Sequence, residues 1–346
     1  MIRLLFCCIS IFLSMSLMAE SDKEANQLNI YSATDLRAMA PILADYQQRN
    51  PGIRLNYYEF DTLELYEAIK ILPMDKQPDI IISSSMDLQV RLVNDGYAQP
   101  LDSATSQSLP SWANWRNEAI GFTYEPIVFV YNKAAFRDKN IPKTHEALAL
   151  SLREGDELYI HKVGSYDVRR SALGYLIATQ DEVTSSISGR IQESLGRTIT
   201  QVYGRTSQLL DDIADGKLVL GYNMLGSYSL ARAKRDPRIG VVIPEDYTLV
   251  VSRVGLISKA AKHVVNAKNF MSYLISPEGQ QVMAEQSELI PLNPKIDPLV
   301  NQLRDIKKSI NFHPIPLGPA LMVYLDQSKK RRFIGAWETA LLPKPQ

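Results

Sequence analysis

The chain has no excess of charge of either sign. Its 346 residues include 38 Lys and Arg and 38 Asp and Glu, so the formal net charge is zero. A nucleic-acid-binding domain usually carries a clear basic excess, and the balance therefore argues against a nucleic-acid partner. A chain of this length exceeds one typical hydrophobic core, so we expect two domains.

Cysteine is nearly absent, and both cysteines, Cys7 and Cys8, lie in an apolar run at the N-terminus. Residues 1–3 provide a positive start, residues 4–18 are almost wholly apolar, and Ala19 precedes a polar stretch. This pattern predicts a cleavable signal peptide over residues 1–19 and an exported, periplasmic product; a buried N-terminal helix is the alternative. The chain without it would have no disulfide and no thiolate metal site.

The common sequence motifs of enzymes are missing as well. The chain has no G-x-S-x-G elbow, no P-loop, no Rossmann glycine pattern and no H-E-x-x-H. Its four histidines are far apart in sequence and form no metal-binding pattern. We therefore predict a protein that is not an enzyme and holds no cofactor, because an exported hydrolase would need catalytic groups that the sequence does not reveal.

Strands and helices alternate in the first part of the chain. Apolar runs predict strands at 28–32, 53–59 and 80–83, and apolar residues at helical spacing predict helices after each of them. Such alternation gives a parallel sheet, and ligands bind beyond the carboxyl ends of its strands. The residues that follow the first and third strands are therefore candidates for ligand contact, with helix capping as the alternative: Ser32, Ala33, Thr34, Ser84 and Ser85.

Residues 216–229, GKLVLGYNMLGSYS, suggest a third such turn. We predict a strand at 218–222, a polar loop, and a helix that includes 230–234. Backbone N–H groups at a turn of this kind bind anions, although an ordinary strand-to-helix connection has the same pattern. The loop supplies four further candidates: Asn223, Gly226, Ser227 and Tyr228.

A fourth polar turn follows a predicted strand at 158–163. It contains Ser165 and Tyr166 and leads into a predicted helix at 168–179, with Arg169 and Arg170 in its first turn. Cations at a helix N-terminus interact unfavourably with the helix dipole. Either a bound anion or solvent exposure would reduce this unfavourable interaction. Because guanidinium suits carboxylate and phosphate, Arg169 is a candidate ligand contact.

Two long β-rich runs, one at 120–131 and one at 240–257 that is broken at 245–247, predict that the chain crosses twice between two lobes. Pro126 interrupts the first run, which is unusual within one sheet, and Tyr124 at this joint is a further site candidate. We expect a first lobe of residues 29–124 and 249–294 and a second lobe of 125–248. Residues 295–346 would form a helical extension packed on the first lobe, and the ligand would bind between the lobes.

Several stretches of the chain resemble the periplasmic solute-binding proteins of ABC importers. They are IYSATDLRAMAPILADYQQRNPGI (30–53), PDIIISSSMDLQVRLVNDGYAQPL (78–101), PIVFVYNKAAF (126–136), DDIADGKLVLGYNMLGSY (211–228) and NAKNFMSYLISPEGQQVMAE (266–285). They are most similar to the branch that holds ferric-ion, phosphorylated-sugar and small-anion receptors. The resemblance implies an α/β, type II venus-flytrap fold, in which two parallel-rich sheets are joined by two hinge strands. It also implies a monomer that hands its ligand to a membrane permease.

The same resemblance bears on the ligand. Ferric-ion receptors usually carry two adjacent tyrosines in the loop that corresponds to 223–228, whereas this chain has Tyr228 alone, followed by Ser229. We therefore expect a small anion, a phosphate ester or a carboxylate, and no metal. Ferric ion with Tyr228 as a ligand stays open as the alternative.

The tail of the chain is similar to that of receptor-like proteins that address a membrane sensor kinase. Residues 315–340 combine an apolar stripe with a basic patch at 329–332. A helix packed on the first lobe with a solvated basic face is one interpretation, and a docking surface is the other. The expected partner is therefore an ABC permease or, alternatively, the ectodomain of a sensor kinase.

Overall fold

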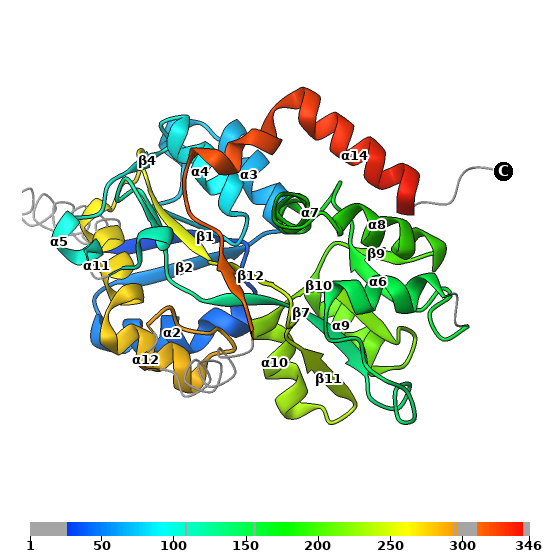
Figure 1. Cartoon of the computed structure of the whole chain (residues 1–346). Coiled ribbons are helices and arrows are strands. Elements are labelled where there is room, and N and C mark those ends of the chain that lie inside the picture. The colour runs from blue at the N-terminus through cyan, green and yellow to red at the C-terminus, as the bar shows by residue number, and fades with distance from the viewer. Residues whose placement is uncertain (1–25, 108, 155–156, 294, 297–309, 342–346) are drawn as a thin grey trace, which may run out of the picture.

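The computed structural model describes residues 26–107, 109–154, 157–293, 295–296 and 310–341 (Figure 1). The expected signal peptide, residues 1–19, lies outside the described residues. Within the described ranges, no helix is both long and apolar enough to cross a membrane. The chain forms two lobes, each built on its own sheet, as Figure 1 shows in blue to cyan for one and green for the other.

The first lobe is built on a sheet with strand order β2-β1-β3-β13-β6-β5. Its strands are β1 (Gln27–Ser32), β2 (Arg54–Glu59), β3 (Ile80–Ser83), β4 (Ala98–Gln99), β5 (Asn114–Trp115), β6 (Ala119–Gly121) and β13 (Val254–Ser258). Its helices are α2 (Leu36–Arg49), α3 (Thr62–Ile71), η1 (Met74–Lys76), α4 (Met86–Asn94), α5 (Ser103–Ser106), η2 (Ser111–Ala113), α11 (Val264–Ile275) and α12 (Pro277–Gln286). The expected alternation is confirmed: β1 pairs in parallel with β2 and β3, and helices connect them.

The second lobe is built on a sheet with strand order β14-β12-β7-β10-β8-β9, and β11 also pairs with β7. Its strands are β7 (Glu125–Asn132), β8 (Val163–Tyr166), β9 (Gln201–Tyr203), β10 (Leu220–Leu225), β11 (Ile239–Val242), β12 (Thr248–Val251) and β14 (Phe312–Pro314). Its helices are α6 (His145–Arg153), α7 (Ala172–Thr184), α8 (Ser188–Arg197), α9 (Thr206–Ala214) and α10 (Gly226–Arg235). Both sheets are mixed, because the strands next to each crossing pair antiparallel.

The chain changes sheet twice within the two long β-runs. After β6 it passes through residues 122–124 and enters the second sheet as β7. It returns from β12 to β13 through Ser252 and Arg253, so the expected boundary after residue 248 falls at the start of β12. Two sheets joined by two hinge strands confirm the predicted fold class.

Burial explains why the strands read as continuous apolar runs. Ile80, Ile81 and Ile82 of β3 are all fully buried, although successive side chains of a strand point to opposite faces. The sheet is therefore covered on both faces, as parallel sheets usually are. This layering leaves the carboxyl ends of β1 and β3 as places where polar side chains can meet a ligand.

Three local predictions were wrong, and each error displaces expected site residues. The strand expected at 158–163 begins only at Val163, because residues 157–162 form turns and His161 has a φ of 60°. The strand expected at 218–222 runs to Leu225, with a register shift and a φ of 60° at Asn223. Helix α7 starts at Ala172, so Arg169 and Arg170 precede it.

The C-terminal segment also lies elsewhere than expected. We predicted that it packs on the first lobe, and η3 (Pro319–Leu325) does contact α4. However, α14 (Gln327–Leu341) lies over α7 and ends beside α8 of the second lobe (Figure 1). Its buried face, Phe333, Trp337 and Leu341, joins the core cluster of the second lobe. The segment therefore bridges both lobes.

The contact between α14 and α8 depends on Gly196. A Cβ at this position would overlap the backbone carbonyl of Ala340, whereas a Cβ at Gly189 of the same helix would meet nothing within 4 Å. We expect Gly196→Ala to lower the free energy of unfolding by about 1–3 kcal/mol, the usual cost of overpacking. Gly189→Ala is the matched control and should not destabilise the protein. Urea denaturation of both variants checks this, and equal effects would contradict the packing described.

Candidate functional site

A cavity of about 490 Å³ lies between the two lobes. The first lobe lines it with residues that follow β1, β2 and β3: Ala33, Asp35, Phe60, Asp61, Thr62 and Ser84. The second lobe and the hinge contribute Tyr166, Ser171, Leu173, Gly204, Arg205, Thr206, Ser207, Leu225, Tyr228 and Arg253. Helices α2, α3, α7, α9 and α10 all begin at or beside this wall. Their N-terminal N–H groups and dipoles favour negative charge in the cavity.

Arg253 is the most deeply held charge in the wall, with 1% of its surface exposed. Its Nε donates to Glu125 Oε1 at 3.2 Å and its Nη1 donates to Thr34 Oγ1 at 2.9 Å. Its guanidinium carbon lies 4.9 Å from the centre of the Tyr228 ring. Nη2 has no hydrogen-bond partner among the described residues. The wall thus presents a buried, oriented donor of the kind that binds carboxylate or phosphate oxygens.

Two tyrosines, Tyr228 in the cavity wall and Tyr57 next to Thr34, have phenols with raised pKa values. The Tyr228 hydroxyl accepts the backbone N–H of Asp35 at 3.2 Å, and burial raises the pKa of Tyr228 well above its usual range. The Tyr57 hydroxyl donates to the Thr34 carbonyl at 2.5 Å, and burial raises the pKa of Tyr57 in the same way. Burial therefore disfavours the phenolate form of both side chains, which is the form that binds a metal ion.

Polar contacts across the cavity hold the lobes together. Arg205 Nε of the second lobe lies 2.6 Å from Asp61 Oδ1, and its Nη1 lies 3.7 Å from Glu59 Oε1. The N–H of Ala172, at the start of α7, donates to Thr62 Oγ1 at 3.0 Å. Partly exposed ion pairs of this kind contribute little each, so the closed arrangement has no single dominant bond.

Four of the predicted site residues line this cavity: Ala33, Ser84, Tyr166 and Tyr228. Others lie directly behind the wall. Thr34 accepts from Arg253, and Ser32 Oγ accepts the N–H of Thr34 at 3.1 Å. The N–H of Ala33 donates to the Ile82 carbonyl at 2.8 Å, so it is not free to donate to a ligand.

Two predicted hydroxyls next to the wall have no partner. Ser85 and Ser227 are 0% and 1% exposed, and neither Oγ has a hydrogen-bond partner among the described residues. Gly226 lies against the Pro126 carbonyl, where a side chain would not fit. These residues follow β3 and β10, as predicted, but they do not line the cavity.

Arg169 and Tyr124 do not reach the cavity. Arg169 Nη2 pairs with Asp167 Oδ2 at 2.7 Å, and its guanidinium faces the Trp337 ring and Glu338 of α14. This arginine therefore contacts the C-terminal helix and does not line the cavity in which we expected it to meet the ligand. Tyr124 packs with the rings of Trp112 and Phe312 at the hinge, because its place between β6 and β7 directs it to that cluster.

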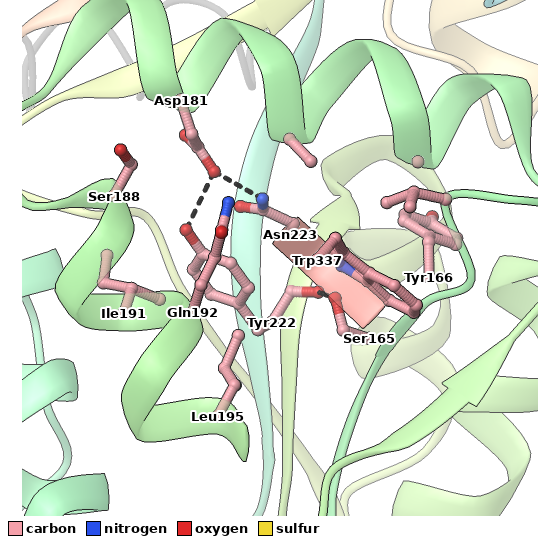
Figure 2. Close-up of a pocket in the computed structure, with 13 residues that line it drawn as sticks. Ser165, Tyr166, Asp181, Ser188, Ile191, Gln192, Leu195, Tyr222, Asn223 and Trp337 are labelled. Carbon is pink, nitrogen blue, oxygen red and sulfur yellow. Dashed lines mark hydrogen bonds between the residues drawn. The ribbon is translucent and has the colours of Figure 1, made fainter. Parts of the chain in front are cut away.

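Ser165 and Asn223 face a different cavity, inside the second lobe (Figure 2). This cavity, of about 410 Å³, lies between α7, α8, β8 and β10, and Trp337 of α14 also lines it. Asn223 Nδ2 donates to Asp181 Oδ2 at 2.5 Å, and Tyr222 donates to the same oxygen at 2.8 Å. Because β8 and β10 run further than predicted, Ser165 and Asn223 are strand residues of the lobe interior and not loop residues of the cleft.

Two charged residues, Arg253 and Asp35, most define the cavity, and sequence reasoning missed the first of them. Arg253 had a signal, since it is the one charged residue in the apolar run TLVVSRVGLI at 248–257. Asp35 belongs to the turn 32–35, for which both helix capping and ligand contact were expected, and its side chain makes no capping hydrogen bond. Within the described ranges, no group of three or more His, Cys, Asp or Glu side chains is placed to hold a metal ion.

Comparison with known proteins places this geometry among transport receptors. The family model described as "Bacterial extracellular solute-binding protein" matches residues 42–311. The substrate-binding protein of an ABC transporter from Agrobacterium tumefaciens is 37% identical, with a TM-score of 0.85 over 92% of this chain and 94% of that one. The fructose-6-phosphate-bound protein AfuA from Actinobacillus pleuropneumoniae shares the fold at 16% identity, with a TM-score of 0.73 over 91% and 98% of the two chains. Iron uptake protein A1 from Synechocystis sp. is 23% identical over 286 residues, which are 79% of this chain and 78% of that protein.

Proposed function

The chain belongs to the bacterial extracellular solute-binding proteins of ABC transporters, and we propose that its solute is a small anion, a phosphate ester or a carboxylate. The observation that carries this proposal is the buried guanidinium of Arg253, a residue of the cavity wall, whose Nη2 has no hydrogen-bond partner among the described residues. A buried donor left unpaired costs about 1–3 kcal/mol, and a ligand oxygen would remove that cost. The helix N-termini around the cavity support the same ligand class.

Binding would work by closure of the two lobes. The pairs Arg205–Asp61, Ala172–Thr62 and Tyr228–Asp35 each join one lobe to the other. A ligand that contacts both walls binds the closed form more tightly than an open form. This difference in affinity shifts the protein toward the closed form. The closed form would then be the one that docks on the membrane permease, after export through the predicted signal peptide. A sensor kinase as the receiving partner stays a prediction.

Ferric ion is the second candidate, because a relative is an iron uptake protein. Tyr228 and Asp35, which lie side by side at the cavity, are oxygen ligands suited to a hard cation. However, the metal would have to displace the proton of a phenol whose pKa burial raises. The anion therefore fits the wall better.

A panel of solutes tests the proposal by thermal unfolding of the chain without residues 1–19. We expect a phosphate ester or a small carboxylate to stabilise the protein, by about 2.7 kcal/mol when present at a hundred times its dissociation constant. The panel contains phosphate, sugar phosphates, mono-, di- and tricarboxylates and ferric citrate, with citrate alone as the control for the last. Stabilisation by ferric citrate and by no other solute would show that the solute is ferric ion and not a small anion. No stabilisation by any phosphate ester or carboxylate would also overturn the proposal.

A further inference from the structure

The cavity wall contains a second charged side chain, the carboxylate of Asp35. This residue precedes α2, but its side chain neither caps the helix nor forms a hydrogen bond or ion pair with another described residue. Burial raises the pKa of this carboxyl and Glu59 adds to the rise, while Arg253, Arg37 and Arg205 partly oppose it. Asp35 therefore brings to the wall a carboxyl that forms no ion pair with another described residue.

Asp35 and the free donor of Arg253 lie close together in the same wall. The backbone N–H of Asp35 donates to the Tyr228 hydroxyl, and the guanidinium of Arg253 lies over the Tyr228 ring. Both side chains line the cavity, and no ion pair of 4.0 Å or less joins them. The cavity wall therefore contains both an acceptor for a cation and a donor for an anion.

The remaining charges increase the need for a cation. Arg253 is already paired with the buried Glu125, and Arg205 is paired with both Asp61 and Glu59. Asp35 is left over, so a ligand with only negative charge would enter a region that is already negative. Charges removed from water need a nearby opposite charge, and the ligand is the remaining source of one.

We propose that the solute is a zwitterion, with an oxyanion on Arg253 Nη2 and an amine-type cation on Asp35. This inference rests on the proposed function and narrows its ligand class to small molecules that carry a carboxylate or phosphoryl group and a charged nitrogen. Phe60 and Tyr228 also line the cavity, and aromatic faces next to Asp35 would add cation–π attraction for the nitrogen.

The test compares zwitterions with matched compounds that lack the amine. The probes are O-phosphoethanolamine and 4-aminobutanoate, their amine-free counterparts ethyl phosphate and butanoate, and butylamine, each titrated by calorimetry. We expect at least one zwitterion to bind about tenfold or more tightly than its amine-free counterpart, as one charge-assisted hydrogen bond provides. In Asp35→Asn this preference should disappear, while affinity for the amine-free anion stays the same or improves.

Asp75→Asn is the matched control, because it removes the same charge from an exposed residue of η1 in the first lobe. It should leave the preference for the zwitterion unchanged. Equal affinity for zwitterion and amine-free anion, or an unchanged preference in Asp35→Asn, would overturn the inference and leave the anion proposal standing. Binding of butylamine without any anion binding would overturn both.

Discussion

Arg253→Met should abolish binding of the anionic solute and lower the free energy of unfolding by about 3–5 kcal/mol. The loss of binding follows from removal of the free Nη2 donor and of the guanidinium stacked on Tyr228. The loss of stability follows from Glu125, which is 0% exposed and would be left buried without its ion-pair partner. Urea denaturation and ligand-induced thermal shifts measure the two effects separately.

The double variant Arg253→Met/Glu125→Gln separates the two roles. It removes the unpaired carboxylate, so most of the lost stability should return, because replacing both members of a buried pair is often nearly neutral. Binding should not return, since the donor is still missing. A double variant that binds its solute as tightly as the parent protein would show that Arg253 does not hold the anion.

Between about pH 4 and pH 7 the free energy of unfolding should fall as the pH rises, because of Asp87. This carboxyl lies in the first turn of α4, with 2% exposure, and burial raises its pKa from 3.8 to about 7. In the unfolded chain it ionises near pH 4, whereas the folded protein keeps the proton until about pH 7. The folded state therefore binds more protons in this window. The slope reaches about 1.4 kcal/mol per pH unit, or about 4 kcal/mol in all.

Asp87→Asn should remove this contribution. The variant should match the parent protein near pH 4 and exceed its free energy of unfolding at pH 8, where the parent must bury a charged carboxylate. Denaturation at a series of pH values, with Asp75→Asn as the exposed control, measures the difference. A difference between Asp87→Asn and the parent that does not change from pH 4 to pH 8 would contradict the prediction.

The fold was predictable because its pattern is local. Alternating apolar runs and amphipathic segments define β1 to α4, and the order of elements alone then dictates a parallel arrangement. The two long β-runs indicated the crossings, although Pro126 itself lies inside β7, paired with Val250 of β12, and the chain changes sheet just before it, at residues 122–124. In each of these cases a stretch of ten or more residues carried the information.

The site was less predictable because its residues depend on where strands end. Ser165 and Asn223 were expected in loops, but pairing with neighbouring strands extends β8 and β10 past them. Arg169 was expected in the first turn of a helix, but α7 begins later, with Ser171 as its cap, and Arg169 forms an ion pair with Asp167. These outcomes are decided by tertiary contacts that a short sequence window does not contain.

The position of α14 shows a further limit. Its apolar stripe correctly indicated a buried face, since Phe333, Trp337 and Leu341 are buried. The stripe does not say which surface it covers, and that is decided by the groove that Gly196 leaves on α8. Matching a helix to its partner requires both surfaces at once.

The place of β13 in the first sheet sets the order in which the protein can be assembled. The strands β7 to β11 of the second lobe come from one continuous stretch, so their sheet can form as soon as residue 242 is available. The first sheet has to wait, because β13 is inserted between β3 and β6 and begins only at Val254. Pairings between distant segments form slowly, and domains of a growing chain fold as their segments emerge. The second lobe starts earlier but finishes later, because its sheet still lacks β14 (Phe312–Pro314) when β13 has completed the first sheet.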